Sequence, residues 1–180
     1  MKTSILLVDD EESVLAALHR VLRLPLRDRA RIELFTDTRL ALARVRERAF
    51  DVVVSDFRMP HQDGISFLGE VRTVQPRAVP LIVSASADVS TLVRAVNDAQ
   101  VFRYLLKPWD DRELLDSIDA ALRRASELRE EHQLAEATRL RQGSLTAAEA
   151  ERRRLEAIEP GITQVEWGPH GEVLMPPLDD

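Results

Sequence analysis

The sequence of 180 residues contains no cysteine. It therefore has no disulfide framework, no thiolate metal site and no thiol nucleophile, and nothing in it indicates an oxidising compartment. No apolar stretch approaches the ~18 residues of a membrane-spanning helix. The first apolar run, Ile5 to Val8, is also far shorter than the core of a signal peptide. We therefore expect a cytoplasmic protein without a membrane partner.

The chain also lacks the charge of a nucleic-acid binder. Its net charge is −6, and 19 of the 25 basic and 19 of the 31 acidic residues lie in residues 1–124. The last third therefore carries the whole acidic excess and would be repelled by a phosphate backbone. We expect no nucleic-acid partner. The four histidines show no spacing typical of metal ligands: His19, His61, His132 and His170.

Short apolar runs alternate with segments of helical period, and 44% hydrophobic content is enough for a core. The apolar runs read as buried strands because they are continuous rather than alternating. Five strand–helix units predict an α/β domain with a parallel sheet and helices on both faces, ending near Arg124. The strands are expected at 4–8, 31–35, 51–55, 80–84 and 101–106, and the helices at 12–24, 38–48, 64–74, 89–99 and from about 110.

Polar side chains follow four of these five strands. Asp9 and Asp10 follow the first strand, Asp56 the third, Ser84 the fourth and Lys107 the fifth. Because the carboxyl ends of parallel strands meet at one edge of an open sheet, these side chains should lie together. Carboxylates without His or Cys suit Mg²⁺, while an ammonium and a hydroxyl can bind phosphate oxygens. The arrangement predicts phosphoryl transfer to a carboxylate at a magnesium site.

Each of these residues taken alone has an ordinary structural explanation. Asp10 would cap the helix that follows it, and Asp56 would be a turn residue. Ser84 would be a loop hydroxyl and Lys107 a surface lysine. Their shared placement at strand ends favours the functional site. Tyr104, in "VFRYLL", is compatible with sheet packing as well as with a switching role.

Four motifs in order along the chain resemble the receiver domain of bacterial two-component response regulators. They are "LLVDDE" (6–11), "VVVSDFRMPHQDG" (52–64), "LIVSASAD" (81–88) and "FRYLLKPWD" (102–110). The resemblance covers residues 3 to about 124. It implies a flavodoxin-like fold with strand order 2-1-3-4-5 and a sensor histidine kinase as partner. It also implies a protein that is not an enzyme beyond its own phosphorylation and dephosphorylation.

The resemblance assigns roles to the residues at the acidic edge. It implies that Asp56 is the phospho-acceptor. It further implies Mg²⁺, for which Mn²⁺ can substitute, held by Asp10, Asp56 and the backbone carbonyl of Arg58, with Asp9 acting through water. No other cofactor is implied.

The resemblance also implies a switch around this edge. Ser84 matches the switch hydroxyl, and Lys107 matches the lysine that pairs with the phosphoryl group. Tyr104 matches an aromatic residue that such domains turn inward or outward on activation. The Lys107–Pro108 bond matches one that is typically cis in receivers.

The last predicted helix is longer than a receiver requires. From about Asp110 to Gln142 it contains no Pro or Gly. We therefore divide the chain into a receiver (1–124), a helical extension (125–142) and a small C-terminal module (143–180). The extension is compatible with a solvated helix or with a coiled coil, and we expect a homodimer through residues 114–142. The 4-3 seam that favours this dimer is formed by Leu114, Ile118, Ala121, Ala125 and Leu128.

The C-terminal module reads as a helix followed by a hairpin. Thr146 and Glu149 have the spacing of a capping box, and Pro160-Gly161 is a stop signal. Residues 162–175 predict two short strands around a turn at 168–171. A lone hairpin is marginal in water, so we expect it to pack near the junction of the dimer.

Three function classes follow from these features. The motif "FRYLLKPWDDREL" resembles receivers linked to cyclic-di-GMP phosphodiesterase domains of the metal-dependent phosphohydrolase type, but residues 125–180 hold no such His/Asp cluster. We favour a response regulator whose output is a phosphorylation-controlled protein–protein contact. A transcriptional regulator with an unrecognised DNA-binding end is opposed by the tail charge. An aspartyl-phosphate phosphatase of the haloacid-dehalogenase kind needs an Asp where Arg58 stands.

Overall fold

The structure, a computed structural model, describes residues 2–85, 88, 97–141 and 146–158, together with the backbone of two short strands. Most of the helix predicted at 89–99 lies outside these residues. The other predicted helices and strands are present, with bounds that shift by two residues or fewer at either end. They are β1 (Thr3–Val8), α1 (Glu12–Leu26), β2 (Ala30–Phe35), α2 (Thr38–Glu47), β3 (Val52–Asp56), α3 (Gly64–Val74), β4 (Val79–Ser84), β5 (Arg103–Leu106), α5 (Asp111–Arg141), α6 (Ala147–Ile158), β6 (Glu166–Trp167) and β7 (Val173–Leu174).

The five-stranded sheet is parallel and has the order β2-β1-β3-β4-β5, as predicted. Its register aligns the carboxyl ends of the central strands. Val8 pairs with Ser55, Asp56 with Val83, and Ser84 with Leu106. The loops that carry the predicted site therefore leave the sheet from the same edge. The topology reverses between β1 and β3, the usual place for a ligand in an open parallel sheet.

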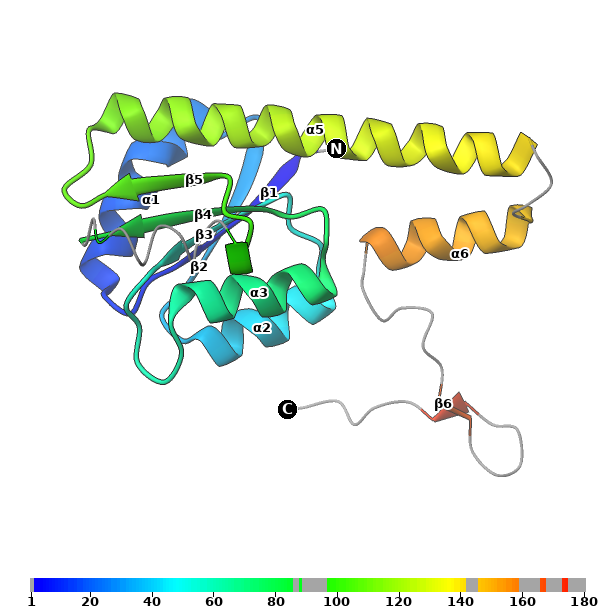
Figure 1. Ribbon diagram of the computed structural model, residues 1–180, viewed down its shortest axis with the longest axis horizontal. Coiled ribbons are helices and arrows are strands. Elements are labelled where there is room, and N and C mark those ends of the chain that lie inside the picture. Colours follow the sequence, from blue (N-terminus) through cyan, green and yellow to red (C-terminus); the bar gives the residue numbers. More distant parts are fainter. Residues whose placement is uncertain are drawn as a thin grey trace.

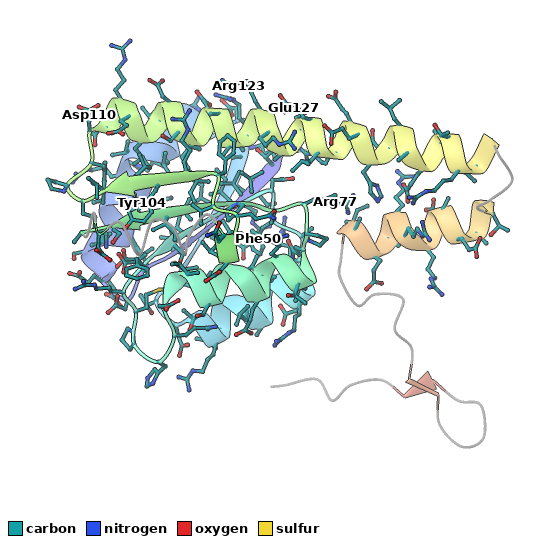
Figure 2. The ribbon with its side chains drawn as sticks, viewed as in Figure 1. Phe50, Arg77, Tyr104, Asp110, Arg123 and Glu127 are labelled. Atoms are coloured by element: carbon teal, nitrogen blue, oxygen red, sulfur yellow. The ribbon has the colours of Figure 1, made fainter. Side chains whose placement is uncertain are left out.

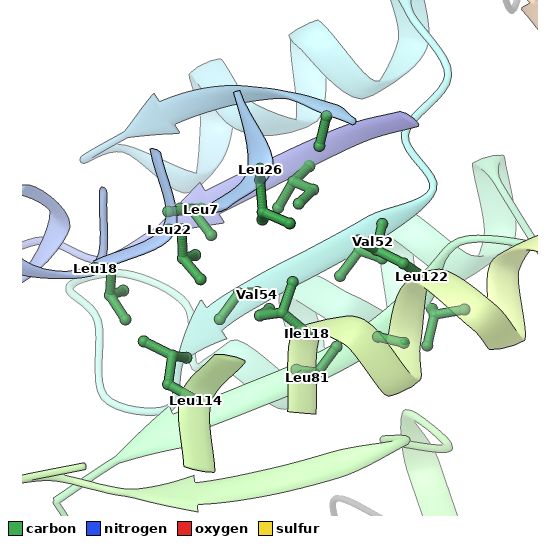
Figure 3. Packing of buried hydrophobic residues seen from close by; sticks show 14 of the residues in the cluster. Leu7, Leu18, Leu22, Leu26, Val52, Val54, Leu81, Leu114, Ile118 and Leu122 are labelled. Atoms are coloured by element: carbon green, nitrogen blue, oxygen red, sulfur yellow. The ribbon is translucent and has the colours of Figure 1, made fainter. Parts of the chain in front are cut away.

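Helices cover both faces of the sheet, with α1 and α5 on one face and α2 and α3 on the other (Figure 1). Alternate residues of each central strand point to opposite faces, so Ile5 and Leu7 pack under α1 and α5 while Leu6 and Val8 pack under α2 and α3. Figure 3 shows the α1/α5 core, to which Leu22 of α1, Ile118 of α5 and Leu81 of β4 belong. Within the described part of the chain no helix is long and apolar enough to cross a membrane.

The predicted coiled-coil seam on α5 is wrong. Leu114, Ile118 and Ala121 are fully buried, and Ala125 is nearly so, in the core between α5 and the sheet of the same chain. Leu128 is the last residue of this stripe and is half-buried. The 4-3 spacing arises because α5 must cover its own sheet, and an amphipathic helix of a single domain has the same period as a coiled coil. A second copy of the chain therefore cannot use this stripe as its interface.

Beyond the receiver, α5 continues and α6 returns beside it (Figure 1). The predicted capping box begins α6. The Glu149 carboxylate accepts hydrogen bonds from the Thr146 amide (2.8 Å) and hydroxyl (2.9 Å), and the Glu149 amide donates to the Thr146 hydroxyl (3.2 Å). The predicted hairpin is also present, because Trp167 of β6 pairs with Val173 of β7 in antiparallel register. Its turn at 168–171 lies outside the described residues, and its packing near the junction stays a prediction.

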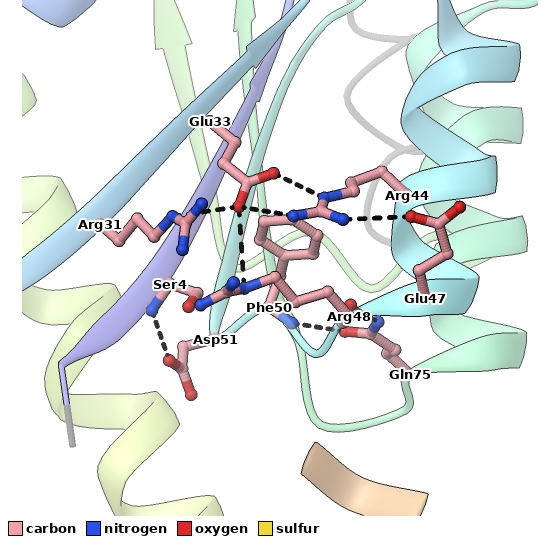
Figure 4. A network of polar contacts seen from close by, with 9 residues as sticks. All are labelled: Ser4, Arg31, Glu33, Arg44, Glu47, Arg48, Phe50, Asp51 and Gln75. Atoms are coloured by element: carbon pink, nitrogen blue, oxygen red, sulfur yellow. Dashed lines mark hydrogen bonds and ion pairs between the residues drawn. The ribbon is translucent and has the colours of Figure 1, made fainter. Parts of the chain in front are cut away.

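A charged cluster stabilises β2, the outermost strand on one side of the sheet. Glu33 of β2 is only 14% exposed and pairs with Arg31 (3.3 Å), Arg44 (2.8 Å) and Arg48 (3.7 Å) (Figure 4). Burial raises the pKa of the Glu33 carboxyl, but the hydrogen bond from Arg44 and the charges of the three arginines outweigh burial and hold the pKa below its usual range. A single carboxylate thus connects the edge strand to α2.

Replacement of Glu33 by Gln should lower the free energy of unfolding by about 1–2 kcal/mol at pH 7, because three guanidinium groups lose their counter-charge. The folded pKa lies below its ordinary value of 4.5. The contribution of the carboxylate is therefore complete above pH 4.5 and disappears as the pH falls through the lowered pKa. Urea unfolding of both proteins at pH 7 and in this acid range checks the prediction. A difference that does not shrink with acid would contradict it.

Candidate functional site

Two buried carboxylates and one ammonium meet at the carboxyl edge of the sheet. Lys107, just after β5, places its Nζ 2.7 Å from Asp9 Oδ2 and 2.6 Å from Asp56 Oδ1. Asp9 is 1% exposed and Asp56 is 6% exposed. Residues separated by nearly a hundred positions in the sequence thus form one charge cluster. Two carboxylates against one ammonium leave a net negative charge, which favours a further cation.

The protonation of this cluster is set by burial and by the bridging ammonium. Burial raises the pKa of the Asp9 carboxyl above its usual range, although the hydrogen bonds from Lys107 and from the Glu11 amide work in the opposite direction. Burial acts to lower the pKa of Lys107, but hydrogen bonds to Asp56 and Asp9 outweigh it and raise that pKa. Lys107 therefore stays charged and holds the two carboxylates together.

The chain around Asp56 is tightly folded. The Arg58 amide donates a hydrogen bond to Asp56 Oδ2, and the Ser55 hydroxyl donates one to the Asp56 carbonyl (2.8 Å). The Gly64 amide donates to the Phe57 carbonyl (2.9 Å) and so closes the loop between β3 and α3. Asp63 caps α3 by accepting from the Ser66 amide (2.8 Å). These bonds fix the carboxylate of Asp56 at the start of the loop.

The remaining predicted residues surround this cluster at different depths. Ser84 is buried at the end of β4, and its carbonyl accepts a hydrogen bond from the Lys107 amide (2.7 Å). The Lys107–Pro108 peptide is cis, as the resemblance implies. Tyr104 lies on β5 (Figure 2), half-buried against the α2/α3 core. Its position agrees with sheet packing and lies three residues before Lys107 on the same strand–loop segment.

The predicted magnesium ligands are brought together only in part. Asp9 and Asp56 converge on Lys107, whereas Asp10 is exposed beside them. In the portion of the chain that the structure describes, no three His, Asp or Glu side chains are placed to hold a metal ion. The donor set nevertheless suits a hard cation, because buried carboxylate oxygens that exceed the local positive charge are the ligands Mg²⁺ prefers.

Gly64, which the sequence does not single out as a site residue, contributes to the site. Gly64 begins α3, and a β-carbon at this position would overlap the backbone carbonyl of Asp56 and approach the Ser55 hydroxyl at 2.9 Å. Only glycine lets α3 start this close to the end of β3. The "DG" pair in "MPHQDG" was the available signal, but a glycine after a loop is too common to indicate such a contact by itself.

Comparison with known protein families matches residues 5–119 to the response regulator receiver domain, which is more than half of the chain. The chain belongs to the response regulator receiver family. Receivers of this family are phosphorylated by sensor histidine kinases and generally bind Mg²⁺ at the phosphorylation site. They are generally not enzymes apart from autophosphorylation. The sheet order is that of CheY-like receivers, which confirms the predicted flavodoxin-like fold.

Curated relatives of the receiver are regulators of transcription. ZraR of Salmonella typhimurium, a transcriptional regulatory protein, is 37% identical over 121 residues, which are 67% of this chain and 26% of ZraR. HoxA of Cupriavidus necator, a hydrogenase transcriptional regulatory protein, is 31% identical over 121 residues, 67% of this chain and 24% of HoxA. The chain thus spans about a quarter of the length of these curated relatives.

Solved structures include receivers from other kinds of protein. The signal receiver domain of an HD domain-containing protein from Pseudomonas fluorescens Pf-5 is 32% identical, with a TM-score of 0.67 over 72% of this chain and 93% of that one. This neighbour is a receiver from an HD domain-containing protein, which agrees with the likeness predicted from the motif "FRYLLKPWDDREL". The beryllofluoride-activated NtrC4 receiver dimer is 27% identical, with a TM-score of 0.62 over 68% of this chain and 98% of that one. Some receivers therefore dimerise.

Proposed function

We propose that this receiver accepts a phosphoryl group on Asp56 from a sensor histidine kinase. The observation that carries the proposal is the ion pair between Lys107 and the buried carboxylates of Asp56 and Asp9. A carboxylate oxygen of Asp56 attacks phosphorus as the bond to the donor nitrogen breaks. Lys107 then pairs with an oxygen of the phosphoryl group, and the Ser84 hydroxyl donates a hydrogen bond to another. We propose that the Tyr104 side chain on β5 turns inward or outward when the Ser84 hydroxyl at the end of the neighbouring strand, β4, binds the phosphoryl group.

We further propose that Asp10, Asp56 and the backbone carbonyl of Arg58 hold Mg²⁺, or Mn²⁺ in its place, with Asp9 acting through water. Bound there, the ion supplies positive charge that offsets the carboxylates and the incoming phosphoryl oxygens. The burial of Asp9 and Asp56 supports this assignment, since one ammonium does not balance two desolvated carboxylates. Asp10, exposed beside them, is open to a cation from solvent.

Removal of divalent cations tests this part of the proposal. With acetyl phosphate as donor, EDTA should reduce the rate of phosphorylation at least a hundredfold, because the carboxylates then repel the phosphate. The Asp10→Ala variant in Mg²⁺ should show a similar loss, while Glu12→Ala, which removes an exposed carboxylate at the start of α1, should label like the wild type. The measurement is incorporation of phosphate over time. Unchanged rates in EDTA would refute the proposed requirement for a divalent cation.

We propose that the output is a protein–protein contact and that one partner is a second copy of the chain. The length of α5 supports this, since the stripe that packs on the sheet ends at Leu128 and the helix continues to Arg141. We also propose the division into a receiver (1–124), a helical extension (125–142) and a C-terminal module (143–180). The curated relatives are named as transcriptional regulators, but this chain matches about a quarter of their length, and its acidic last third opposes a DNA contact.

We propose that the protein acts in the cytoplasm, as the sequence predicts.

A further inference from the structure

The part of α5 beyond the sheet (residues 129–141) and α6 together form a helical hairpin (Figure 1). The two helices of this hairpin contact each other and leave a groove of about 350 Å³ open to solvent. The groove is lined by Gln133, Ala137 and Leu140 of α5 and by Ala150, Glu151 and Arg154 of α6. Glu136 of α5, only 15% exposed, also lines the groove, so the lining combines apolar side chains with a largely buried carboxylate and the exposed charges of α6.

The helical hairpin is fixed to the receiver at its base. Arg129 of α5 pairs with Asp51 (3.1 Å), and the other oxygen of Asp51 accepts a hydrogen bond from the Ser4 amide (2.7 Å). The last carbonyl of α6, that of Ile158, accepts a hydrogen bond from the Ala49 amide (3.4 Å). Both helices are therefore tied to the amino ends of β1 and β3, so the groove is held in a defined position before any partner binds.

The helical hairpin leaves part of its apolar surface exposed to solvent. Leu140 is 39% exposed in the groove, and Leu155 and Ile158 of α6 are exposed to the same degree. Helices of this length are marginal in water unless an apolar face is covered. A second pair of helices is the occupant that covers such a groove along its whole length.

The charges on the groove rim favour a second copy of the same hairpin. The rim carries the exposed carboxylate of Glu151 and the guanidinium of Arg154, which lies 3.7 Å from it. A two-fold contact places the same surface on both sides, so it needs both signs of charge on one surface. Turning one groove onto another brings Arg154 of each copy toward Glu151 of the other.

We propose that two copies of the chain pair groove to groove and form a four-helix bundle from their helical hairpins. The inference rests on the proposed function, because it names the partner of the protein–protein output. The groove takes the place of the predicted dimer interface on residues 114–128, because the sheet of the same chain already covers those residues. The bundle would set the distance and orientation between the two receivers through the bonds of Arg129 and Ile158.

Two leucines on α5 give a matched test. Leu140 lines the groove, whereas Leu134 is 70% exposed and does not. Leu134 follows Glu127 by two helical turns, and Figure 2 shows Glu127 on the side of α5 away from α6. Sedimentation at tens of micromolar should give a dimer for the wild type and for Leu134→Glu, and a monomer for Leu140→Glu. A monomeric wild type, or equal dissociation by both variants, would overturn the proposal.

The charge pairing is tested by mixing variants. Arg154→Glu and Glu151→Arg should each weaken the homodimer about tenfold, because like charges then face each other across the two-fold axis. An equimolar mixture of the two should dimerise like the wild type, since each Glu then meets an Arg of the other chain. Failure of the mixture to recover, with both variants folded by circular dichroism, would show that Arg154 and Glu151 do not meet across an interface.

Phosphorylation of the same samples separates this inference from the proposed function. Leu140→Glu should be monomeric and should still accept phosphate on Asp56 from acetyl phosphate. A wild type that dimerises but accepts no phosphate would overturn the proposed function and leave the groove contact standing. A wild type that accepts phosphate as a monomer would overturn the groove contact alone.

Discussion

The Asp56→Asn variant should accept no phosphate from acetyl phosphate or from a phospho-histidine donor, a loss of at least a thousandfold. An amide lacks the negative oxygen that attacks phosphorus, while its size keeps the hydrogen bond from the Arg58 amide. The net negative charge of the Asp9, Asp56 and Lys107 cluster also disappears, because Lys107 then pairs with one carboxylate, that of Asp9. The fold should therefore survive, and the measurement is phosphate incorporation by a folded variant.

Asp51→Asn is the matched control for this experiment. Asp51 immediately precedes the strand that Asp56 ends, and it also pairs with a cation, Arg129 (3.1 Å), but at the opposite edge of the sheet. Its replacement should leave the phosphorylation rate within about twofold of the wild type, because Asp51 lies at the other end of β3 from Asp56 and asparagine keeps an oxygen for the Ser4 amide. Loss of labelling in both variants would indicate general damage to the domain. Undiminished labelling of Asp56→Asn would refute the acceptor assignment.

Replacement of Gly64 by Ala should cost about 3 kcal/mol or more of unfolding free energy. The new methyl group would overlap the backbone carbonyl of Asp56, which cannot rotate away as a flexible side chain can. Either α3 or the end of β3 must move. Because that movement displaces the acceptor carboxylate, the phosphorylation rate should fall at least tenfold in whatever fraction stays folded.

Gly69→Ala is the control, because a β-carbon at Gly69 meets no atom within 4 Å apart from its chain neighbours and the backbone of its own helix. Gly69 lies inside α3, so alanine there should raise the unfolding free energy by about 0.5–1 kcal/mol through helix propensity. Urea unfolding should show a lower unfolding free energy for Gly64→Ala and a higher one for Gly69→Ala than for the wild type. Labelling with acetyl phosphate measures the effect of each change on Asp56. Equal stability of the two variants would mean that α3 does not approach β3 this closely.

The sheet and its site could be predicted from sequence because they rest on local patterns. Continuous runs such as "DVVVS" identify buried strands, and parallel strands bring their carboxyl ends to one edge whatever the details of packing. That reasoning placed Asp9, Asp56 and Lys107 together, and the structure joins them by two ion pairs. The strand order needed the family resemblance, since periodicity carries no information on which strands are neighbours.

Other features depend on contacts that a local pattern does not contain. The stripe from Leu114 to Leu128 has the period of a coiled coil, but its partner is the sheet of the same chain. Only the three-dimensional arrangement distinguishes the two, because both bury a stripe of the same width. The same holds for Gly64 and for Arg129, whose roles come from approaches to Asp56 and Asp51.

Direct location of the phosphoryl group tests the central claim most sharply. After reaction with acetyl phosphate and Mg²⁺, cleavage after Arg48 and Arg58 releases a peptide that contains Asp51, Ser55 and Asp56. Borohydride reduction of an acyl phosphate followed by mass spectrometry identifies the modified residue. The account predicts one phosphoryl group per chain, on Asp56. A phosphoryl group on Ser55, on Asp51 or in a different peptide would contradict it.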